Sequence, residues 1–369
     1  MLVFVLNAGS SSLKYQLIDI KSKELKASGL VERIGIDGIL KHEIGENKKI
    51  TFELPIPTHK EAIELVLRIL TNDETKVINS IDEIKAIGHR VVHGGEYFKG
   101  SVIVDDEVIR KIEELIPLAP LHNPANILGV KICKDLMPKV PNVVTFDTAF
   151  HQTMPMENFL YAVPYADYTE HHLRKYGFHG TSHYYVSQEA IKLLNKKDSK
   201  VIVCHLGNGS SVCAVKDGKS ISTSMGLTPL EGLVMGTRSG DIDAGVIPYL
   251  MEKKGLNHIQ ILDYLNKKSG ILGVSGVSSD LREVIKAAND GDKRSKIAIT
   301  MLCDRIKKYL CSYAGLMHGV DAICFTAGIG ENSDLIREKV CEGLEFMGIE
   351  IDKDKDSKRE KGNREINTK

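Results

Sequence analysis

The stretch NAGSSSLK, residues 7–14, combines a short Gly/Ser loop with two flanking polar side chains, Asn7 and Lys14. Small residues let a main chain approach a ligand closely, and successive N–H groups at a tight turn can hold an anion. The loop therefore predicts a phosphate site, with the serine hydroxyls as further donors. An ordinary turn, in which Asn7 ends a strand and Lys14 is a solvated charge, is the alternative interpretation.

Two further glycine-rich stretches, HLGNGSS (205–211) and FTAGIGENS (325–333), also follow apolar runs. The second is interpreted as a strand, a glycine turn and a helix start, an arrangement that binds nucleotide phosphates. Neither GxGxxG nor GxxxxGK followed by Ser or Thr occurs in the sequence. A Rossmann or P-loop fold is therefore not predicted, and a bound nucleotide would need a different fold.

Histidine, arginine and aspartate residues gather in segments after apolar runs, many of them beside glycines. Each alone has a structural explanation: a lone His is usually a satisfied polar group, Asp147 could cap a turn, and Arg238 could pair with Asp241. Their number favours a functional site. The zinc pattern HExxH is absent, and the glycine in FHGTSH argues against a regular helix there. The segments are GHRVVHGGE with His89, Arg90, His93 and Glu96, PLHNP with His122, TFDTAFH with Asp147 and His151, FHGTSH with His179 and His183, and GTRSGDIDAG with Arg238, Asp241 and Asp243.

Strand and helix patterns alternate along the chain, which predicts an α/β architecture. Helices are expected over 58–71, 105–117 and 333–346, with Ser333 as the N-cap of the last. Residues 154–168 lack clear periodicity and are expected to connect two domains, 1–150 and 151–369. The hairpin patterns VFVLNAGSSSLKYQLID and VIVCHLGNGSSVCAVKDG form a repeat, which predicts two related domains with a cleft between them.

Composition limits the function classes. Lys plus Arg and Asp plus Glu both number 49 in 369 residues, so a general nucleic-acid or membrane-surface binder, which needs a basic excess, is not predicted. The seven cysteines are widely spaced without CxxC, which indicates buried thiols in a reducing cytosol. The N-terminus shows no signal-peptide pattern and no apolar run reaches about 18 residues, so we expect a cytoplasmic protein.

Taken together, these segments resemble the acetate kinase (acetokinase) family. The matching motifs follow the family's order from residue 3 to about residue 350: NAGSSSLKYQL, GHRVVHGG, PLAPLHNP, FDTAFH, KYGFHGTSH, CHLGNGSS, GLTPLEGLVMGTRSGDID and FTAGIGENS. The resemblance implies the sugar-kinase, heat-shock ATPase and actin superfamily, with two duplicated RNase H-like domains and ATP in the cleft between them. It also implies a homodimer that transfers phosphate reversibly between ATP and acetate with Mg²⁺, or Mn²⁺ in its place.

The resemblance also assigns roles by position. Asn7 would contact the metal, Lys14 the phosphates and Arg90 the acetate carboxylate, while His179 and Arg238 would stabilise the transition state beside an essential Asp147. The resemblance further implies two active-site histidines, His122 and His205, and a pocket for the acetate methyl group formed by Val92, Leu121, Phe178 and Pro229. It implies three ATP-binding segments. The first is His205, Leu206, Gly207, Asn208 and Gly209, the second is Asp280, Leu281 and Arg282, and the third is Gly328, Ile329, Gly330, Glu331 and Asn332.

The chemistry of this reaction sets what Asp147 has to do. A carboxylate acceptor is already ionised at pH 7, so it needs no general base. We therefore expect Asp147 to act through Mg²⁺ or by orienting arginine and histidine groups, although the family is often described with an acid/base at this position. The transferred phosphoryl group carries its charge on three equatorial oxygens, which two arginines and an imidazole can stabilise.

The C-terminal part of the sequence departs from the family pattern. Family members continue beyond KGNREINTK with a further strand, a TNEE-like segment and a terminal helix, and that segment carries a glutamate that helps to bind Mg²⁺. The sequence given is expected to be a shortened form, because a chain without that glutamate would lack a metal ligand. The charged stretch DKDKDSKREKGNRE, residues 352–365, is expected to be a surface loop.

Two alternative functions stay open at this point. A propionate kinase of the same family differs by one methylene in its substrate, a distinction worth roughly 1–3 kcal/mol. A non-catalytic actin-like or chaperone-type ATPase is the other, but such a protein would have no use for a small-anion site built from Arg90, His179 and Arg238.

Overall fold

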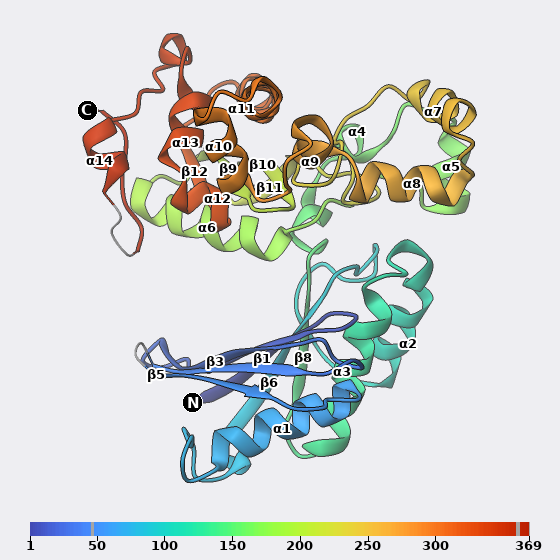
Figure 1. Ribbon diagram of the computed structural model, residues 1–369, viewed down its shortest axis with the longest axis vertical. Helices are drawn as coiled ribbons and strands as arrows, with labels where there is room; N and C mark the ends of the chain where they lie inside the picture. The colour runs from blue at the N-terminus through green and yellow to red at the C-terminus, as the bar shows by residue number, and fades with distance from the viewer. Residues whose placement is uncertain (46–47, 359–361, 369) are drawn as a thin grey trace. The chain divides into compact units, whose positions relative to one another are not determined.

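The structure is a computed structural model that describes residues 1–45, 48–358 and 362–368. The chain forms two compact units, Met1–Ala149 and Phe150–Lys369 (Figure 1). The first unit ends one residue before the division expected at 150/151.

The first unit is built on an eight-stranded sheet with the order β5-β4-β3-β2-β1-β6-β8-β7. Strand β1 pairs antiparallel with β2 and parallel with β6, which in turn pairs parallel with β8. The strands are β1 (Leu2–Ala8), β2 (Leu13–Asp19), β3 (Glu24–Glu32), β4 (Ile39–Ile44), β5 (Lys48–Glu53), β6 (Ile84–Val91), β7 (Val102–Ile103) and β8 (Asn142–Phe146), and the helices are α1 (His59–Thr71), α2 (Asp106–Glu114) and α3 (Asn123–Leu136).

Residue alternation decides which face of this sheet is covered. Phe4, Leu6, Leu13 and Tyr15 are buried and belong to the same core cluster as the apolar sides of α1 and α3 (Figure 1). Asn7 and Lys14 are cross-strand partners at the alternate positions. They therefore point to the opposite face of the sheet, away from α1 and α3.

The second unit is built on a four-stranded sheet with the order β11-β10-β9-β12. Helix α6 covers one face and α11 the other (Figure 1). The strands are β9 (Lys200–Leu206), β10 (Ser210–Lys216), β11 (Lys219–Thr223) and β12 (Ala322–Thr326), and the helices are α4 (Met156–Phe159), α5 (Tyr165–His171), α6 (Gly180–Leu194), α7 (Val246–Lys254), α8 (His258–Lys267), α9 (Gly270–Ser275), α10 (Leu281–Asn289), α11 (Lys293–Met317), α12 (Ala327–Asn332), α13 (Asp334–Cys341) and α14 (Lys353–Ser357).

The two sheets share a four-strand motif. The order β3-β2-β1-β6 in the first unit matches β11-β10-β9-β12 in the second. In both, the first three strands are antiparallel neighbours and the last pairs in parallel with the third. The duplication predicted from the two Gly/Ser hairpins is therefore confirmed.

Several local predictions hold and others are corrected. Helix α1 begins after the N-cap Thr58, as expected. The helix predicted over 333–346 begins after its N-cap Ser333 but ends at Cys341, because the next residue, Glu342, leaves the helical conformation with ψ 126°. The segment 154–168 contains α4 and the start of α5.

Two predictions at glycine-containing motifs are wrong. Gly180 in FHGTSH does not prevent a helix but begins α6. In FTAGIGENS the chain passes from β12 directly into α12 without a glycine turn, and Ala327 takes the left-handed conformation instead.

The surface loop predicted over 352–365 is also wrong in its first part, because residues 353–357 form α14 and Asp356 is buried. Residues 359–361 of that prediction lie outside the described residues.

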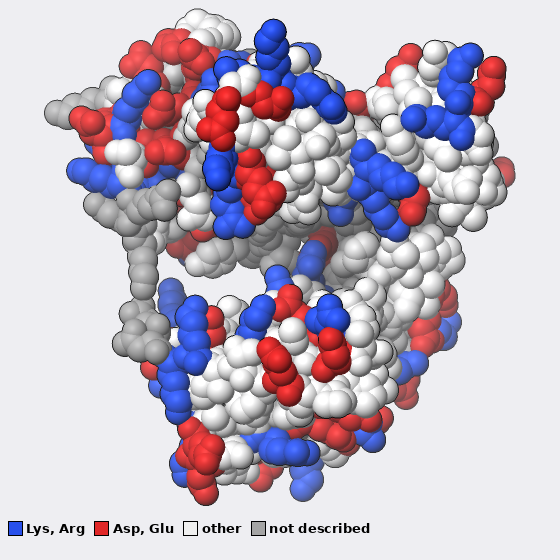
Figure 2. Space-filling view, viewed as in Figure 1, with Lys and Arg blue, Asp and Glu red and all other residues white. Residues whose placement is uncertain are grey.

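Charged residues of both signs are mixed on the surface. Lys and Arg are interspersed with Asp and Glu over the face seen in Figure 2. Within the described residues, no helix combines the length and apolar character that crossing a membrane requires. All seven cysteines are free, and five of them are buried.

Candidate functional site

An ion pair joins the ends of two neighbouring strands in the first unit. Arg90 of β6 donates from Nε to both carboxylate oxygens of Asp147, at 2.9 and 3.1 Å, and from Nη2 to Oδ2 at 2.5 Å. The Asp147 side chain is only 4% exposed, whereas that of Arg90 is 42% exposed. Asp147 therefore fixes one edge of the guanidinium, and Nη1 has no bonding partner among the described residues.

The electrostatics of this pair follow from its burial. The negative charge of Asp147 raises the pKa of Arg90, so the guanidinium is always charged. A guanidinium held on one edge can still bind a second carboxylate through its other N–H groups. The arrangement can hold a small carboxylate at a defined place.

Two asparagines in the first turn of α3 hold the loop that follows β6. Asn123 Oδ1 accepts from the His93 amide at 3.1 Å, and Asn126 Oδ1 accepts from the Val92 amide at 3.0 Å. Asn126 Nδ2 also donates to the carbonyl of Ala8 at 2.7 Å, at the end of β1. From this motif only Leu121 and His122 were predicted as site residues. The two asparagines, three residues apart at the start of a helix, were the signal for these contacts.

The Gly/Ser loop of the first unit is a tight turn fixed from α1. The Gly9 amide donates to the carbonyl of Ser12 at 2.8 Å, and His59 Nε2 lies 2.6 Å from the carbonyl of Gly9. Asn7 is half-buried and Lys14 is exposed. Lys14 has no bonded partner among the described residues, so its charge is available to an anion.

Strand parity places Arg90 with Asn7 and Lys14. Leu6 pairs with His89, and both are buried on the core face. Asn7 and Arg90 follow these two residues, so they face the other side of the sheet. The three cationic or amide side chains predicted for the first unit therefore share one face.

In the second unit, two predicted transition-state groups lie beside Gly209. A Cβ atom on Gly209 would lie 3.3 Å from Arg238 Nη1 and 3.9 Å from His179 Cε1. Only a residue without a side chain leaves this space open. Arg238 and His179 therefore lie close together beside Gly209, where both could donate to one group with oxygen atoms, such as a phosphoryl group.

Arg238 is a half-buried cation without an acidic partner. Its Nη1 donates to the carbonyl of Pro229 at 3.2 Å, and the described residues include no carboxylate within ion-pair distance. Burial lowers the pKa of the guanidinium. A desolvated, uncompensated charge of this kind attracts an anion more strongly than one in water.

A cluster of histidines and serines surrounds His179 at the start of α6. His179 Nδ1 and His183 Nε2 lie 2.8 and 2.7 Å from Ser211 Oγ on β10, and Ser182 Oγ lies 2.8 Å from His205 Nδ1 on β9. The rings of His179 and His205 are 4.2 Å apart.

The backbone supports this placement. Ser211 and His205 are cross-strand partners on the face covered by α6. His179 has φ 57°, a strained conformation for a residue other than glycine. Such strain is found where the surrounding structure fixes a functional side chain. The sequence analysis did not identify Ser182 or Ser211 as partners of these histidines.

The three segments predicted to bind ATP come together around the loop of residues 207–209. His205 pairs with Thr326, and a Cβ on Gly207 would lie 4.0 Å from Ala327 Cβ, next to residues 328–332. A Cβ on Gly236 would lie 1.7 Å from Asn208 Oδ1 and 3.1 Å from the carbonyl of Ser279, next to Asp280. Gly236 therefore lets the first and second segments approach.

The side chains in these segments differ in what they can offer. Leu206 and Leu281 are buried in the core, so only their backbone atoms could contact a ligand, whereas Ile329 is partly buried against that core. Asp280 accepts from Arg282, which lowers the pKa of its carboxyl to about 2. Glu331 accepts from the Ala327 amide, and Asn332 donates to the carbonyl of Gly328.

The predicted acetate pocket draws on both units. Val92 is buried and Leu121 is 72% exposed in the first unit, and Phe178 is buried and Pro229 half-buried in the second. His122 is the exposed N-cap residue of α3. The pocket that these residues would form stays a prediction, as does the cleft between the domains.

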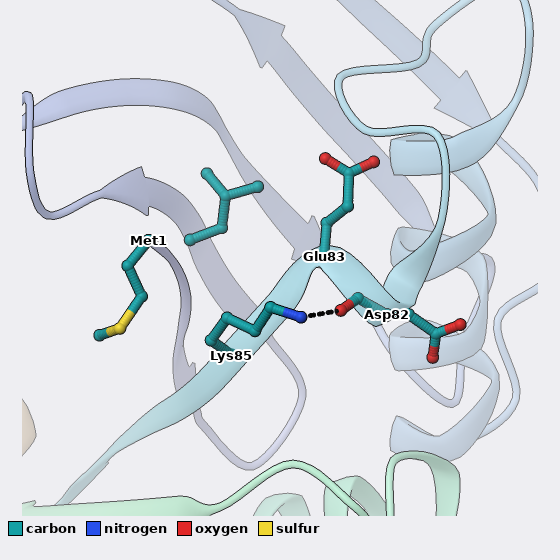
Figure 3. A pocket seen from close by; sticks show the side chains of 5 residues that line it. Met1, Asp82, Glu83 and Lys85 are labelled. Carbon is teal, nitrogen blue, oxygen red and sulfur yellow. Dashed lines mark hydrogen bonds between the residues drawn. The ribbon is translucent and has the colours of Figure 1, made fainter.

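Of two surface hollows, one lies away from the predicted site residues and the other includes a few of them. Figure 3 shows one at the start of β1 and β6, where Lys85 donates to the carbonyl of Asp82 at 2.8 Å. It lies at the opposite strand ends from Asn7 and Arg90, so we assign it no role. The other includes residues 330–332 together with α6 and β12.

The described residues contain no group of three or more His, Cys, Asp or Glu that could hold a metal ion. Mg²⁺ does not need such a group, because it usually keeps several waters and binds through one or two side chains together with substrate phosphates. Asn7 and Asp147 are oxygen donors of the kind it accepts.

Comparison with known proteins gives one consistent result. The sequence model of the Acetokinase family matches residues 2–369. An acetate kinase from Treponema denticola is 56% identical over 364 residues, covering 98% of this chain and 92% of that protein. The crystal structure of Porphyromonas gingivalis acetate kinase is 48% identical with a TM-score of 0.96, covering 100% of this chain and 93% of that one. A propionate kinase structure from Francisella tularensis is 44% identical with a TM-score of 0.93, with the same coverage.

Proposed function

Since the chain belongs to the acetokinase family, we propose that it transfers the γ-phosphoryl group of ATP reversibly to acetate, giving acetyl phosphate and ADP. The observation that carries this proposal is the Arg90–Asp147 pair, which holds a guanidinium with one edge open. Such a group fits a small carboxylate, and a protein that only hydrolyses ATP would have no use for it.

The acceptor has to be held against electrostatic repulsion. Acetate and the triphosphate are both anions, so they approach each other only when a cation fixes the acceptor. Arg90 supplies that charge, and Asp147 keeps the guanidinium in one orientation. Holding the acceptor oxygen in line with the phosphorus replaces a bimolecular encounter and removes much of its entropic cost.

The phosphoryl group in transit is stabilised from the second unit. Its charge is spread over three equatorial oxygens. Arg238 and His179, which both lie beside Gly209, donate to those oxygens. Because these donors are already in place, they need little reorganisation when the charge develops.

The nucleotide is held by the three glycine-containing segments around residues 207–209, and Lys14 contacts its phosphates. Asn7 is the residue that would hold Mg²⁺, or Mn²⁺ in its place. When bound, the metal offsets the negative charge of the polyphosphate.

Asp147 acts as a positioning residue and not as a general base, because the acceptor is already ionised. Both of its carboxylate oxygens accept from Arg90. We expect kcat/KM for acetate to show no ionisation that disappears in Asp147→Asn. A limb of the pH–rate profile lost in that variant would show that Asp147 exchanges a proton.

The decisive experiment traps acyl phosphate with hydroxylamine in the presence of ATP, Mg²⁺ and acetate, propionate or butyrate. We expect product with acetate first and propionate second. Strongest product with propionate would favour the activity named for the Francisella tularensis relative. ADP release that is indifferent to carboxylates would favour an ATPase instead.

We also propose a cytoplasmic homodimer. Seven free cysteines suit a reducing compartment. Large apolar side chains exposed on α7 and α8, Tyr249, Ile259 and Leu262, offer a surface for a second copy. Sedimentation equilibrium tests the dimer, and a monomer at micromolar concentration would contradict it.

A further inference from the structure

One serine hydroxyl lies between two histidines at the predicted transition-state site. Ser211 Oγ is 2.8 Å from His179 Nδ1 and 2.7 Å from His183 Nε2. Ser211 and His183 are fully buried. A hydroxyl has one proton, so it can donate to only one of the two rings and must accept from the other.

The environment of His183 decides the direction of these bonds. Burial and the neighbouring histidines lower its pKa well below the usual value, so the ring is neutral and carries one proton. Its Nδ1 is buried without a partner among the described residues. A proton on Nδ1 would leave a buried N–H unsatisfied, whereas a proton on Nε2 is donated to Ser211.

The position of that proton sets the direction of the other hydrogen bond of Ser211. If His183 donates to Ser211 Oγ, the hydroxyl proton of Ser211 is free to be donated to His179 Nδ1. The proton of a neutral His179 must then be on Nε2. Each bond in such a chain polarises the next, so the arrangement is stronger than its separate bonds.

We propose that His183 and Ser211 are positioning residues that fix His179 in the tautomer with its proton on Nε2. His179 then presents an N–H donor to the phosphoryl oxygens without having to be charged. This inference rests on the proposed function, because it assigns the donor that His179 uses in phosphoryl transfer.

The test combines a spectroscopic and a kinetic measurement on the full chain. Two-bond ¹H–¹⁵N correlation spectra of imidazole-labelled protein report which ring nitrogen carries the proton, and the spectrum of His179→Gln assigns the His179 signals. We expect a single Nε2–H tautomer for His179 in the unmodified protein at pH 7.5. In Ser211→Ala we expect a mixture of tautomers.

The value of kcat should change in the same variants as the tautomer of His179. Ser211→Ala should lower kcat by about 10- to 100-fold, with the KM values for acetate and ATP changed much less, because a supporting hydrogen bond and not a substrate contact is lost. Ser211→Thr keeps the hydroxyl and should recover most of the loss. Ser220→Ala is the matched control, since it removes a buried 2.8 Å bond to His151 Nδ1 from the same sheet and should leave the His179 signals unchanged.

Several results would overturn the inference. A proton on Nδ1 of His179, or on both nitrogens, in the unmodified protein would do so even if every Ser211 variant failed to fold. So would an unchanged tautomer and kcat in a folded Ser211→Ala. Absence of acyl phosphate from the unmodified protein with any acid would instead contradict the proposed function, while the spectra would still decide the tautomer.

Discussion

The two hairpins β1–β2 and β9–β10 have the same topology but present their functional groups differently. In the first, buried residues alternate with more exposed ones, so one face is core and the other presents Asn7 and Lys14. In the second, β10 is buried on both faces except at Lys216. Its polar groups lie where the hairpin meets its surroundings, at the loop 207–209 and under the first turn of α6.

The difference follows from what covers each sheet. Helices α1 and α3 cover one face of the first hairpin, whereas α6 and α11 cover both faces of the second. A sheet open on one side can present ligand-binding groups along its strands. A sheet covered on both sides can do so only at its ends, and there the groups are held by more neighbours.

The largest effect is expected from the second unit. Arg238→Ala should lower kcat by about 10³- to 10⁵-fold, the range for an arginine that stabilises a transferred phosphoryl group. Initial rates of acyl hydroxamate formation measure it, with the exposed Arg110→Ala as a control for general loss of charge. Less than a tenfold loss would mean that Arg238 does not touch the phosphoryl group.

The matching substitution in the first unit should have a smaller effect, and that effect should be on the use of acetate. Asp147→Asn leaves Arg90 without a charged partner, and truncating such a pair costs about 2–5 kcal/mol. We expect kcat/KM for acetate to fall by about 100-fold while KM for ATP changes little. An equal loss for both substrates would contradict a role confined to the acceptor.

Acid should destabilise the protein through its buried neutral histidines. Burial lowers the pKa of His89 from 6.5 to about 4. Between these values the unfolded chain binds a proton that the folded chain does not, so stability is full above about pH 6.5 and falls as the pH decreases towards 4. The shift corresponds to about 3 kcal/mol.

Urea unfolding followed by circular dichroism at pH 7 and pH 4 measures this loss, because the chain contains no tryptophan for fluorescence. His89→Gln should reduce the pH dependence by about 3 kcal/mol, and the exposed His258→Gln should leave it unchanged. The same dependence in all three proteins would show that His89 is not the titrating group.

The smallest effect on kcat is expected from alanine substitutions in the two glycine loops, and it should differ between them. Gly209→Ala places a Cβ 3.3 Å from Arg238 Nη1, so the guanidinium must move slightly. Because a misplacement of about 1 Å costs about 100-fold, this smaller shift should lower kcat by up to about tenfold. Gly9→Ala meets only the Ser12 hydroxyl at 2.9 Å, a side chain that can rotate. Its loss should be smaller, and equal losses would refute the contrast between the loops.

Local patterns along the chain were enough to predict the architecture and the candidate site residues. Alternation in β2, the N-caps Thr58 and Ser333, and the repeated Gly/Ser hairpin are local patterns, so they are readable without the fold. The motif order was sufficient to indicate the family that the comparisons show. The helix start at Gly180 was missed, because a glycine's cost can be offset by contacts outside the segment.

Which of these groups contact each other becomes visible only in the folded chain. Asp147 accepts from Arg90 across 57 residues, Ser211 joins His179 to His183 across about 30, and Arg337 holds Asp356 in a stretch predicted as a loop. Such bonds depend on how separate elements pack, and composition or periodicity contains no record of that packing. The residue types were visible in the chain, whereas the geometry that gives them a function is a property of the folded units.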